Sequence, residues 1–170
     1  AKYQLRNMYI WGTYSLGYVQ RDDAEQVYPT IFDRRHNMNL LSSYSFGHKQ
    51  SWEASARWNF GSGFPFTKTQ AFFDQILFDK GATTEYEIKN PDHIGVIYSE
   101  ERKGGRLPYY HRLDISLKKK IEFSKYSYME ILASVTNVYD RKNIFYFDRI
   151  KYERVDQLPI LPTLGIKVGF

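Results

Sequence analysis

Polar and apolar residues alternate along most of this chain with a period of two, which is the period of a β-strand. Every second residue from Trp52 to Phe60 is apolar, and the residues between them are polar. Helical spacing is hard to find, and only 69–80 could form a short helical or irregular piece. The pattern predicts an all-β, antiparallel fold with about six strands, at approximately 4–20, 33–47, 51–67, 107–123, 127–146 and 156–170.

The connections between these segments alternate in length. Residues 21–32 and 69–106 are long connections, 47–50 and 123–125 are tight turns, and 148–156 is of medium length. Long loops on the outer side and short turns on the periplasmic side are typical of a transmembrane β-barrel. We therefore expect 69–106 to be a long extracellular loop.

Charged residues fall almost entirely on one face of the expected strands. The central windows 8–18, 36–46, 52–62, 109–121, 129–139 and 160–170 hold nine formal charges. Eight share the polar face: Glu53, Arg57, Arg112, Asp114, Lys118, Lys120, Glu130 and Lys167. Lys119 is the exception, and it lies near a turn, where its stem can reach the interface. A Lys or Arg facing lipid at the midplane costs about 2–4 kcal/mol, so we expect these eight charges to face a wet lumen.

Aromatic residues gather at the ends of the expected strands. The chain has 15 Tyr, 12 Phe and 3 Trp, and such residues suit the boundary between an oily band and water. The turn side carries Phe46, Trp52, Phe123 and Phe170, and the loop side carries Tyr18, Phe60, Tyr109 and Tyr139. A soluble antiparallel sandwich also alternates in polarity, but there the apolar face would form a dry core.

Composition excludes several other classes. There are no cysteines, so there is no disulfide scaffold and no Cys-based metal or redox site. No run of 18 apolar residues exists, so the sequence predicts no transmembrane helix, and no signal peptide opens the chain. The net charge is +5, but the run Lys118–Lys120 alternates between faces on a strand and makes no basic patch. We therefore expect no nucleic-acid partner.

Several stretches resemble the C-terminal barrel strands of TonB-dependent outer-membrane receptors. They are Tyr28-Pro29, 32–39, Trp58 through Gly63, 106–116, 137–143 (Asn-Val-Tyr-Asp-Arg-Lys-Asn) and the ending 161–170. The resemblance covers nearly the whole chain, and the element 137–143 and the terminal aromatic are its most specific parts. It implies a 22-stranded barrel filled by an N-terminal plug, in the outer membrane of a Gram-negative type of cell.

By this resemblance, residues 1–170 are expected to be the C-terminal segment of such a barrel, about six strands without a plug. Six strands cannot close around a lumen, and an open sheet would expose unpaired backbone groups to lipid. The expected partners are outer-membrane lipid, and the remaining strands and plug of the same receptor. The energy-coupling protein would be reached only through the N-terminal part. The transported ligand is not identified by the sequence.

The resemblance makes Phe170 a recognition signal for the barrel-assembly machinery, which would act on the C-terminal strand. The loop residues Phe72, Phe73, Phe78, Tyr86 and Tyr98 are candidates for ligand contact, since long ordered loops often carry function. Residues 33–36 (Asp-Arg-Arg-His) could touch an anion, although a polar strand entry with charges paired in the wall is favoured. We expect no catalytic, cofactor or metal site, because the four His residues are scattered and His111 falls on the lipid-facing parity.

Three other hypotheses about the function stay open. A structural or adhesive outer-membrane module would share the barrel wall but transport nothing. A soluble basic β-domain could bind nucleic acid through its aromatic and basic residues. An outer-membrane enzyme is the most distant, because the expected lumen face shows no catalytic constellation.

Overall fold

The computed structural model describes residues 1–74, 94–124, 126–149, 151 and 153–170. Within these ranges the chain is all-β and its strands pair antiparallel, which confirms the all-β, antiparallel part of the predicted fold. The only helical element there is one short 3₁₀ turn, η1 (His48–Gln50). No helix among these residues is long and apolar enough to cross a membrane.

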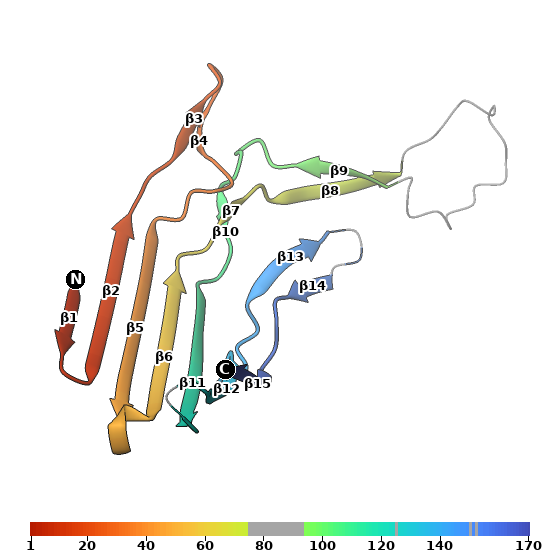
Figure 1. Cartoon of the computed structure of the whole chain (residues 1–170). Coiled ribbons are helices and arrows are strands. Elements are labelled where there is room, and N and C mark those ends of the chain that lie inside the picture. Colours follow the sequence, from red (N-terminus) through yellow and green to blue (C-terminus); the bar gives the residue numbers. More distant parts are fainter. Residues whose placement is uncertain (75–93, 125, 150, 152) are drawn as a thin grey trace, which may run out of the picture.

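Seven strands form one sheet in the order β1-β2-β5-β6-β11-β12-β15 (Figure 1). Their bounds are β1 Lys2–Leu5, β2 Met8–Leu16, β5 His36–Phe46, β6 Trp52–Gly61, β11 Tyr110–Glu122, β12 Tyr128–Thr136 and β15 Leu161–Gly169. The described residues of β1 and β15 each pair on one side only, so the sheet is open at both edges.

The first expected strand, 4–20, is divided in the structure. Its N-terminal part belongs to β1, which turns back at Arg6 and Asn7 and pairs with β2, so that Leu5 lies opposite Met8. Arg6 has a φ of +42°, and Asn7 is a residue type that turns favour. The prediction of one continuous strand was wrong here because it passed over Arg6 and Asn7, two consecutive polar residues that interrupt the alternation.

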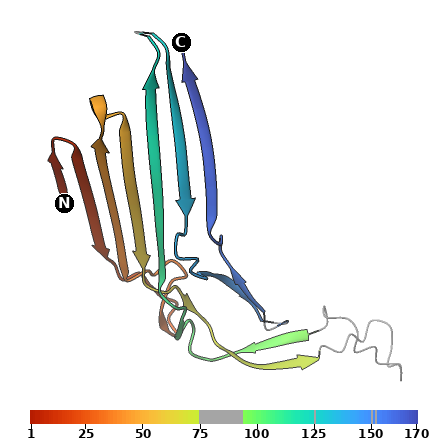
Figure 2. The ribbon, with the colours of Figure 1, turned by 90° about the horizontal axis from the view of Figure 1, so that it is seen from below.

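The remaining strands form four small two-stranded sheets beyond the loop end of the large sheet. They pair β3 (Gln20–Asp22) with β4 (Val27–Pro29), β7 (Pro65–Phe66) with β10 (Gly105–Arg106), β8 (Thr69–Asp74) with β9 (Ile94–Tyr98), and β13 (Ile144–Asp148) with β14 (Glu153–Asp156). Figure 2 shows β8–β9 and β13–β14 extending from the end opposite η1. The connections expected to be long therefore carry ordered strands, and 69–74 is a strand and not a helical piece.

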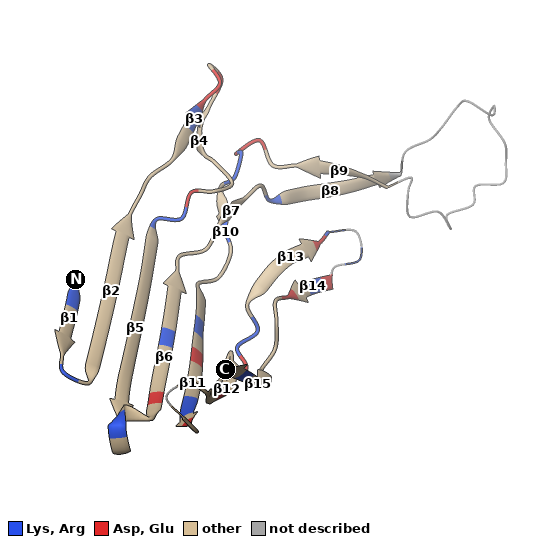
Figure 3. Cartoon of the chain, viewed as in Figure 1, with Lys and Arg blue, Asp and Glu red and all other residues tan. Residues whose placement is uncertain are grey.

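The pairing register extends the two-residue alternation across the whole sheet. Leu40, Trp58 and Leu113 are cross-strand neighbours on one face, and Asn39, Asn59 and Arg112 are neighbours on the other. Every Asp, Glu, Lys and Arg of the seven strands lies on the second face, except Lys119. Figure 3 shows no charged residue on β2 or β5, and bands of both signs on β6 and β11. The sheet thus has an apolar face and a polar face.

No layer of secondary structure from the described residues packs on the apolar face. Figures 1 and 2 show a single curved sheet, and no Ala, Val, Leu, Ile, Met or aromatic side chain among the described residues is buried. Ile115 and Leu117 in the middle of the sheet are 43% and 40% exposed, and Leu164 on β15 is 73% exposed. The dry core that a soluble sandwich requires is absent from the described part of the chain.

Aromatic rings border the apolar face at both ends. At the turn end, Tyr44 stacks on Phe46 and Phe46 on Trp52, with ring centroids 6.0 and 6.2 Å apart. At the loop end, Phe60 stacks on Trp58 (5.8 Å) and on Tyr109 (5.7 Å). Between these two rows the face carries Ala54, Ala56, Ile115 and Leu117.

Candidate functional site

The loop end of the sheet holds every buried polar side chain among the described residues. These are Asp33, Ser62, Asn137 and Asn143. Each belongs to a connection and not to one of the seven strands. A buried polar group is costly unless it is hydrogen-bonded, so this cluster marks where the loops are fixed onto the sheet.

Asp33 joins three connections. Its carboxylate accepts hydrogen bonds from the Val19 N–H (2.9 Å) and from the guanidinium of Arg106 on β10. Arg106 also donates to the carbonyl oxygens of Asp33 (3.1 Å) and Gly63 (3.2 Å). Burial by itself raises the pKa of Asp33, but the Val19 N–H and the Arg106 charge together bring that pKa below its usual range.

The element 137–143 fixes the chain as it leaves β12. The Asn137 amide donates to the carbonyl oxygens of Arg141 (3.0 Å) and Leu158 (3.1 Å), and its own oxygen accepts from the Arg141 N–H (3.0 Å). The Asn143 side chain bonds both backbone groups of His111, at 2.9 and 3.2 Å. The Asn143 side chain thus pairs with the β11 backbone in the way that the backbone of a neighbouring strand would.

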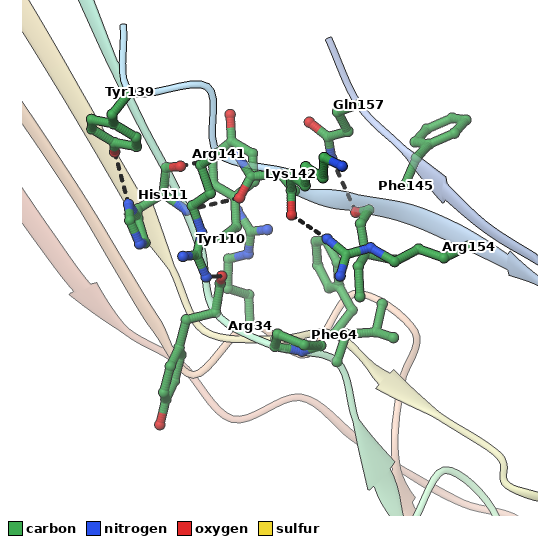
Figure 4. Close-up of a pocket in the computed structure, with 16 residues that line it drawn as sticks. Arg34, Phe64, Tyr110, His111, Tyr139, Arg141, Lys142, Phe145, Arg154 and Gln157 are labelled. Atoms are coloured by element: carbon green, nitrogen blue, oxygen red, sulfur yellow. Dashed lines mark hydrogen bonds between the residues drawn. The ribbon is translucent and has the colours of Figure 1, made fainter. Parts of the chain in front are cut away.

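A cavity of about 650 Å³ opens beside this element (Figure 4). Its charged lining residues are Arg34, Arg141, Lys142 and Arg154, and no Asp or Glu in the described part of the chain lines it. Arg34 lies over Gly61, where any larger side chain would collide with its guanidinium. The Arg34 guanidinium carbon is 4.3 Å from the Phe64 ring centroid and 5.4 Å from that of Tyr110, which are cation–π distances.

A second cavity, of about 740 Å³, lies between hairpins β8–β9 and β13–β14. Phe66, Phe72, Phe145 and Phe147 are among its lining residues. Leu107 and Phe145 line both cavities, so the two cavities adjoin. We call the first the cationic cavity and the second the aromatic cavity. A ligand at this end of the sheet would meet cations on one side of Phe145 and aromatic rings on the other.

Of the five loop aromatics proposed for ligand contact, the three that the structure describes do not line one cavity together. Phe72 lines the aromatic cavity, whereas Phe73 packs against the backbone of Gly95 and is half exposed. Tyr98 receives the Arg149 guanidinium at 5.0 Å from its ring centroid. Phe78 and Tyr86 lie outside the described residues. Their role in ligand contact stays a prediction.

The strand entry 33–36 divides between the two roles considered for it. Asp33 pairs with Arg106 and, at 3.9 Å, with Arg35, as a polar strand entry would. Arg34 instead faces the cationic cavity. His36 Nδ1 hydrogen-bonds the Tyr14 hydroxyl at 2.9 Å on the apolar face.

The eight charges expected to face a lumen share the polar face of the sheet. Several are paired there: Arg112 with Asp114 at 3.0 Å, and Lys118 with Glu53 at 2.6 Å. Between them runs a row of hydroxyls that the register aligns across five strands, Ser43, Ser55, Ser116, Ser134 and Thr163. Ser55 bonds Ser116, and Ser134 bonds Thr163, both at 2.6 Å. This face suits water or another polar surface.

Sequence reasoning missed three lining residues of the cationic cavity: Arg141, Lys142 and Arg154. Arg141 and Lys142 belong to the element that carries the resemblance, and nothing in their spacing pairs them with Arg34, more than a hundred residues earlier. Across the described ranges, no group of three His, Asp or Glu side chains could hold a metal ion. No family model, curated protein or solved structure matches the chain.

Replacing Asn137 tests its role in fixing the loops. Asn137→Gly should lower the free energy of unfolding by roughly 2–4 kcal/mol, because the carbonyl oxygens of Arg141 and Leu158 lose a donor and the Arg141 N–H loses an acceptor. Asn137→Ala should cost about 1 kcal/mol more, since Asn137 has a φ of +55°. Denaturant titration of the folded protein measures both values.

Asn59→Ala on the polar face of β6 is the matched control, and a change of no more than about 0.5 kcal/mol is expected. An Asn137→Gly variant as stable as the parent would show that these hydrogen bonds do not hold the loop end.

The lowered pKa of Asp33 makes a signed prediction for pH. Its stabilising effect is complete above the unfolded-state pKa of about 4 and is lost as the pH falls through the lower folded-state pKa. Asp33→Asn should therefore cost roughly 1–3 kcal/mol at neutral pH, and the difference from the parent should shrink toward pH 2. Denaturant titrations at several pH values measure it, and a difference independent of pH would contradict the ion pair.

Proposed function

We propose that the seven-stranded sheet is a section of the wall of an outer-membrane β-barrel, with its apolar face toward lipid and its polar face toward an aqueous interior. The observation that carries this proposal is the apolar face itself. It runs across seven strands, has no covering layer among the described residues, and excludes every formal charge of those strands but one. Exposed apolar surfaces of this extent mark interaction sites in water, and lipid is the partner that suits a whole sheet face.

The exception, Lys119, fits the same arrangement. Its ammonium group donates to Ser51 Oγ at 2.9 Å and lies 4.6 Å from the Trp52 ring centroid. Trp52 belongs to the row of aromatic rings at the turn end of the sheet, and Ser51 precedes it in the chain. A lysine at the edge of a membrane can keep its charge in the polar interface while its stem covers apolar surface.

The distance between the aromatic rows supports a membrane band. Trp52 and Phe60 are eight residues apart on β6, or about 27 Å at about 3.4 Å per residue. At a strand tilt of about 40°, this length spans roughly 20 Å across a bilayer, close to the apolar band of about 25 Å in outer-membrane barrels. The rings at either end then lie at the interfaces, where Trp and Tyr are enriched.

The open edges of the sheet support the proposal that further strands pair with it. Unpaired backbone groups cannot face hydrocarbon, so β1 and β15 need neighbours. The resemblance to TonB-dependent receptors supplies them, as the rest of a larger barrel around a plug. In this proposal the protein takes up an unidentified ligand and carries out no chemistry on it. The loop end binds the ligand outside the cell, and the C-terminal strand with Phe170 is read by the assembly machinery.

Adjacent leucines on β5 provide a matched test of the two faces. Leu40 lies on the apolar face and Leu41 on the polar face, both near the middle of the strand. Leu40→Lys should destabilise the folded protein in lipid bilayers by about 2–4 kcal/mol, because it places an ammonium near the midplane. Leu41→Lys should cost less than about 1 kcal/mol. Urea titration after folding into vesicles, followed by gel mobility, measures both.

Equal effects of the two substitutions would contradict the assignment of faces. A protein that stays monomeric and folded in water without detergent would contradict the membrane location and would favour a soluble domain.

A further inference from the structure

The two adjoining cavities at the loop end differ in what they offer a ligand. The cationic cavity brings Arg34 from before β5, Arg141 and Lys142 from the element after β12, and Arg154 from β14. The aromatic cavity brings phenylalanines from β7, β8 and β13. Connections far apart in the sequence thus converge on one composite hollow around Leu107 and Phe145.

The positive charge of the cationic cavity is only partly compensated. Arg154 forms an ion pair with Asp156 and donates to the Lys142 carbonyl oxygen. Arg141 donates to the Tyr109 carbonyl oxygen at 3.0 Å. No carboxylate lies within ion-pair distance of Arg34, Arg141 or Lys142 among the described residues. Three cations in one cavity repel one another, so an anion placed between them would be stabilised.

Arg34 is already held in position for such an anion. Its guanidinium lies against Phe64 and Tyr110 and over Gly61, so little rotamer freedom remains to be lost on binding. The Nε atoms of Arg34 and Arg141 are buried and have no hydrogen-bond partner. Burial also lowers the pKa of Arg34. A planar guanidinium presents paired donors that match a carboxylate or phosphate.

We propose that the two cavities form one binding site for an organic anion, with its oxyanion group among Arg34, Arg141 and Lys142 and a flat aromatic body among Phe66, Phe72 and Phe145. The cavity volumes of about 650 and 740 Å³ are in the range of small-molecule sites. The inference that uptake begins at this site rests on the proposed receptor function. The inference that the site binds an organic anion is tested separately.

The direct test is calorimetric titration of the purified protein, in detergent, with three probes. Naphthalene-2,6-dicarboxylate carries both features, cyclohexane-1,4-dicarboxylate carries the charge without the aromatic body, and inorganic phosphate carries the oxyanion alone. Saturable binding of the naphthalene compound, at least about tenfold tighter than of the other two, is expected. Equal affinity for all three would overturn the aromatic half of the site, and no saturable binding of any would overturn the whole.

Variants assign the binding to these residues. Lys142 is exposed, so Lys142→Gln should fold normally and weaken binding of the naphthalene compound about tenfold, the usual effect of losing one charge-assisted hydrogen bond. Arg34→Gln should weaken it at least as much. Lys151→Gln, on the turn between β13 and β14 and outside both cavities, is the matched control and should bind as the parent does.

Equal losses in Lys142→Gln and Lys151→Gln would show a general charge effect and overturn the site. The test also separates the two proposals. Loss of binding specificity together with the expected Leu40→Lys and Leu41→Lys results would reject the site and keep the membrane barrel. Specific binding by a protein that proves soluble would keep the site and reject the barrel.

Discussion

In-register antiparallel pairing is the constraint on which the rest of the structure depends. One strand that alternates between polar and apolar residues has two faces, but seven such strands make a two-faced sheet only if each pair meets in phase. The register does this without a slip from β2 to β15. A shift of one residue at any pair would move a whole strand's charges to the apolar face. The lone exception, Lys119, lies at the turn end, where such a placement is least costly.

The two ends of the sheet are built differently, and the difference follows from the connections. At the turn end the chain reverses within a few residues, and rings such as Phe46 and Trp52 stack across neighbouring strands. At the loop end the connections are long and form two-stranded sheets, which among the described residues cover no apolar core. Buried polar contacts hold them instead, with Asp33 and Asn137 each joining separate parts of the chain. This is how a sheet without an apolar core keeps its loops, and the proposed anion site, in fixed positions.

Much of the fold was predictable, because alternation is local information. The alternation in residues 52–60 predicts β6 and its two faces from that segment alone. The reversal at Arg6 and Asn7 was missed because an interruption of only two polar residues was taken as part of one strand. The predicted strand 127–146 ran past the end of β12 at Thr136 into β13, which pairs with β14 in a separate hairpin. The cationic cavity was not predictable. Arg34 and Arg141 come together only through the register of β6 and β11 and the side-chain bonds of Asn143, which residue spacing does not encode.

The contact that each face makes is the central claim, and the absence of cysteine from the sequence makes it directly measurable. Single cysteines at each position from Leu113 to Lys118 on β11 can carry a spin label in the protein reconstituted into bilayers. Labels at Leu113, Ile115 and Leu117 should be relaxed by oxygen, which concentrates in lipid, and the intervening labels by a water-soluble nickel complex. Two accessibility profiles that alternate in opposite phase are the predicted result. Profiles that rise and fall together, or show oxygen at neither set, would contradict a sheet with lipid on one face and water on the other.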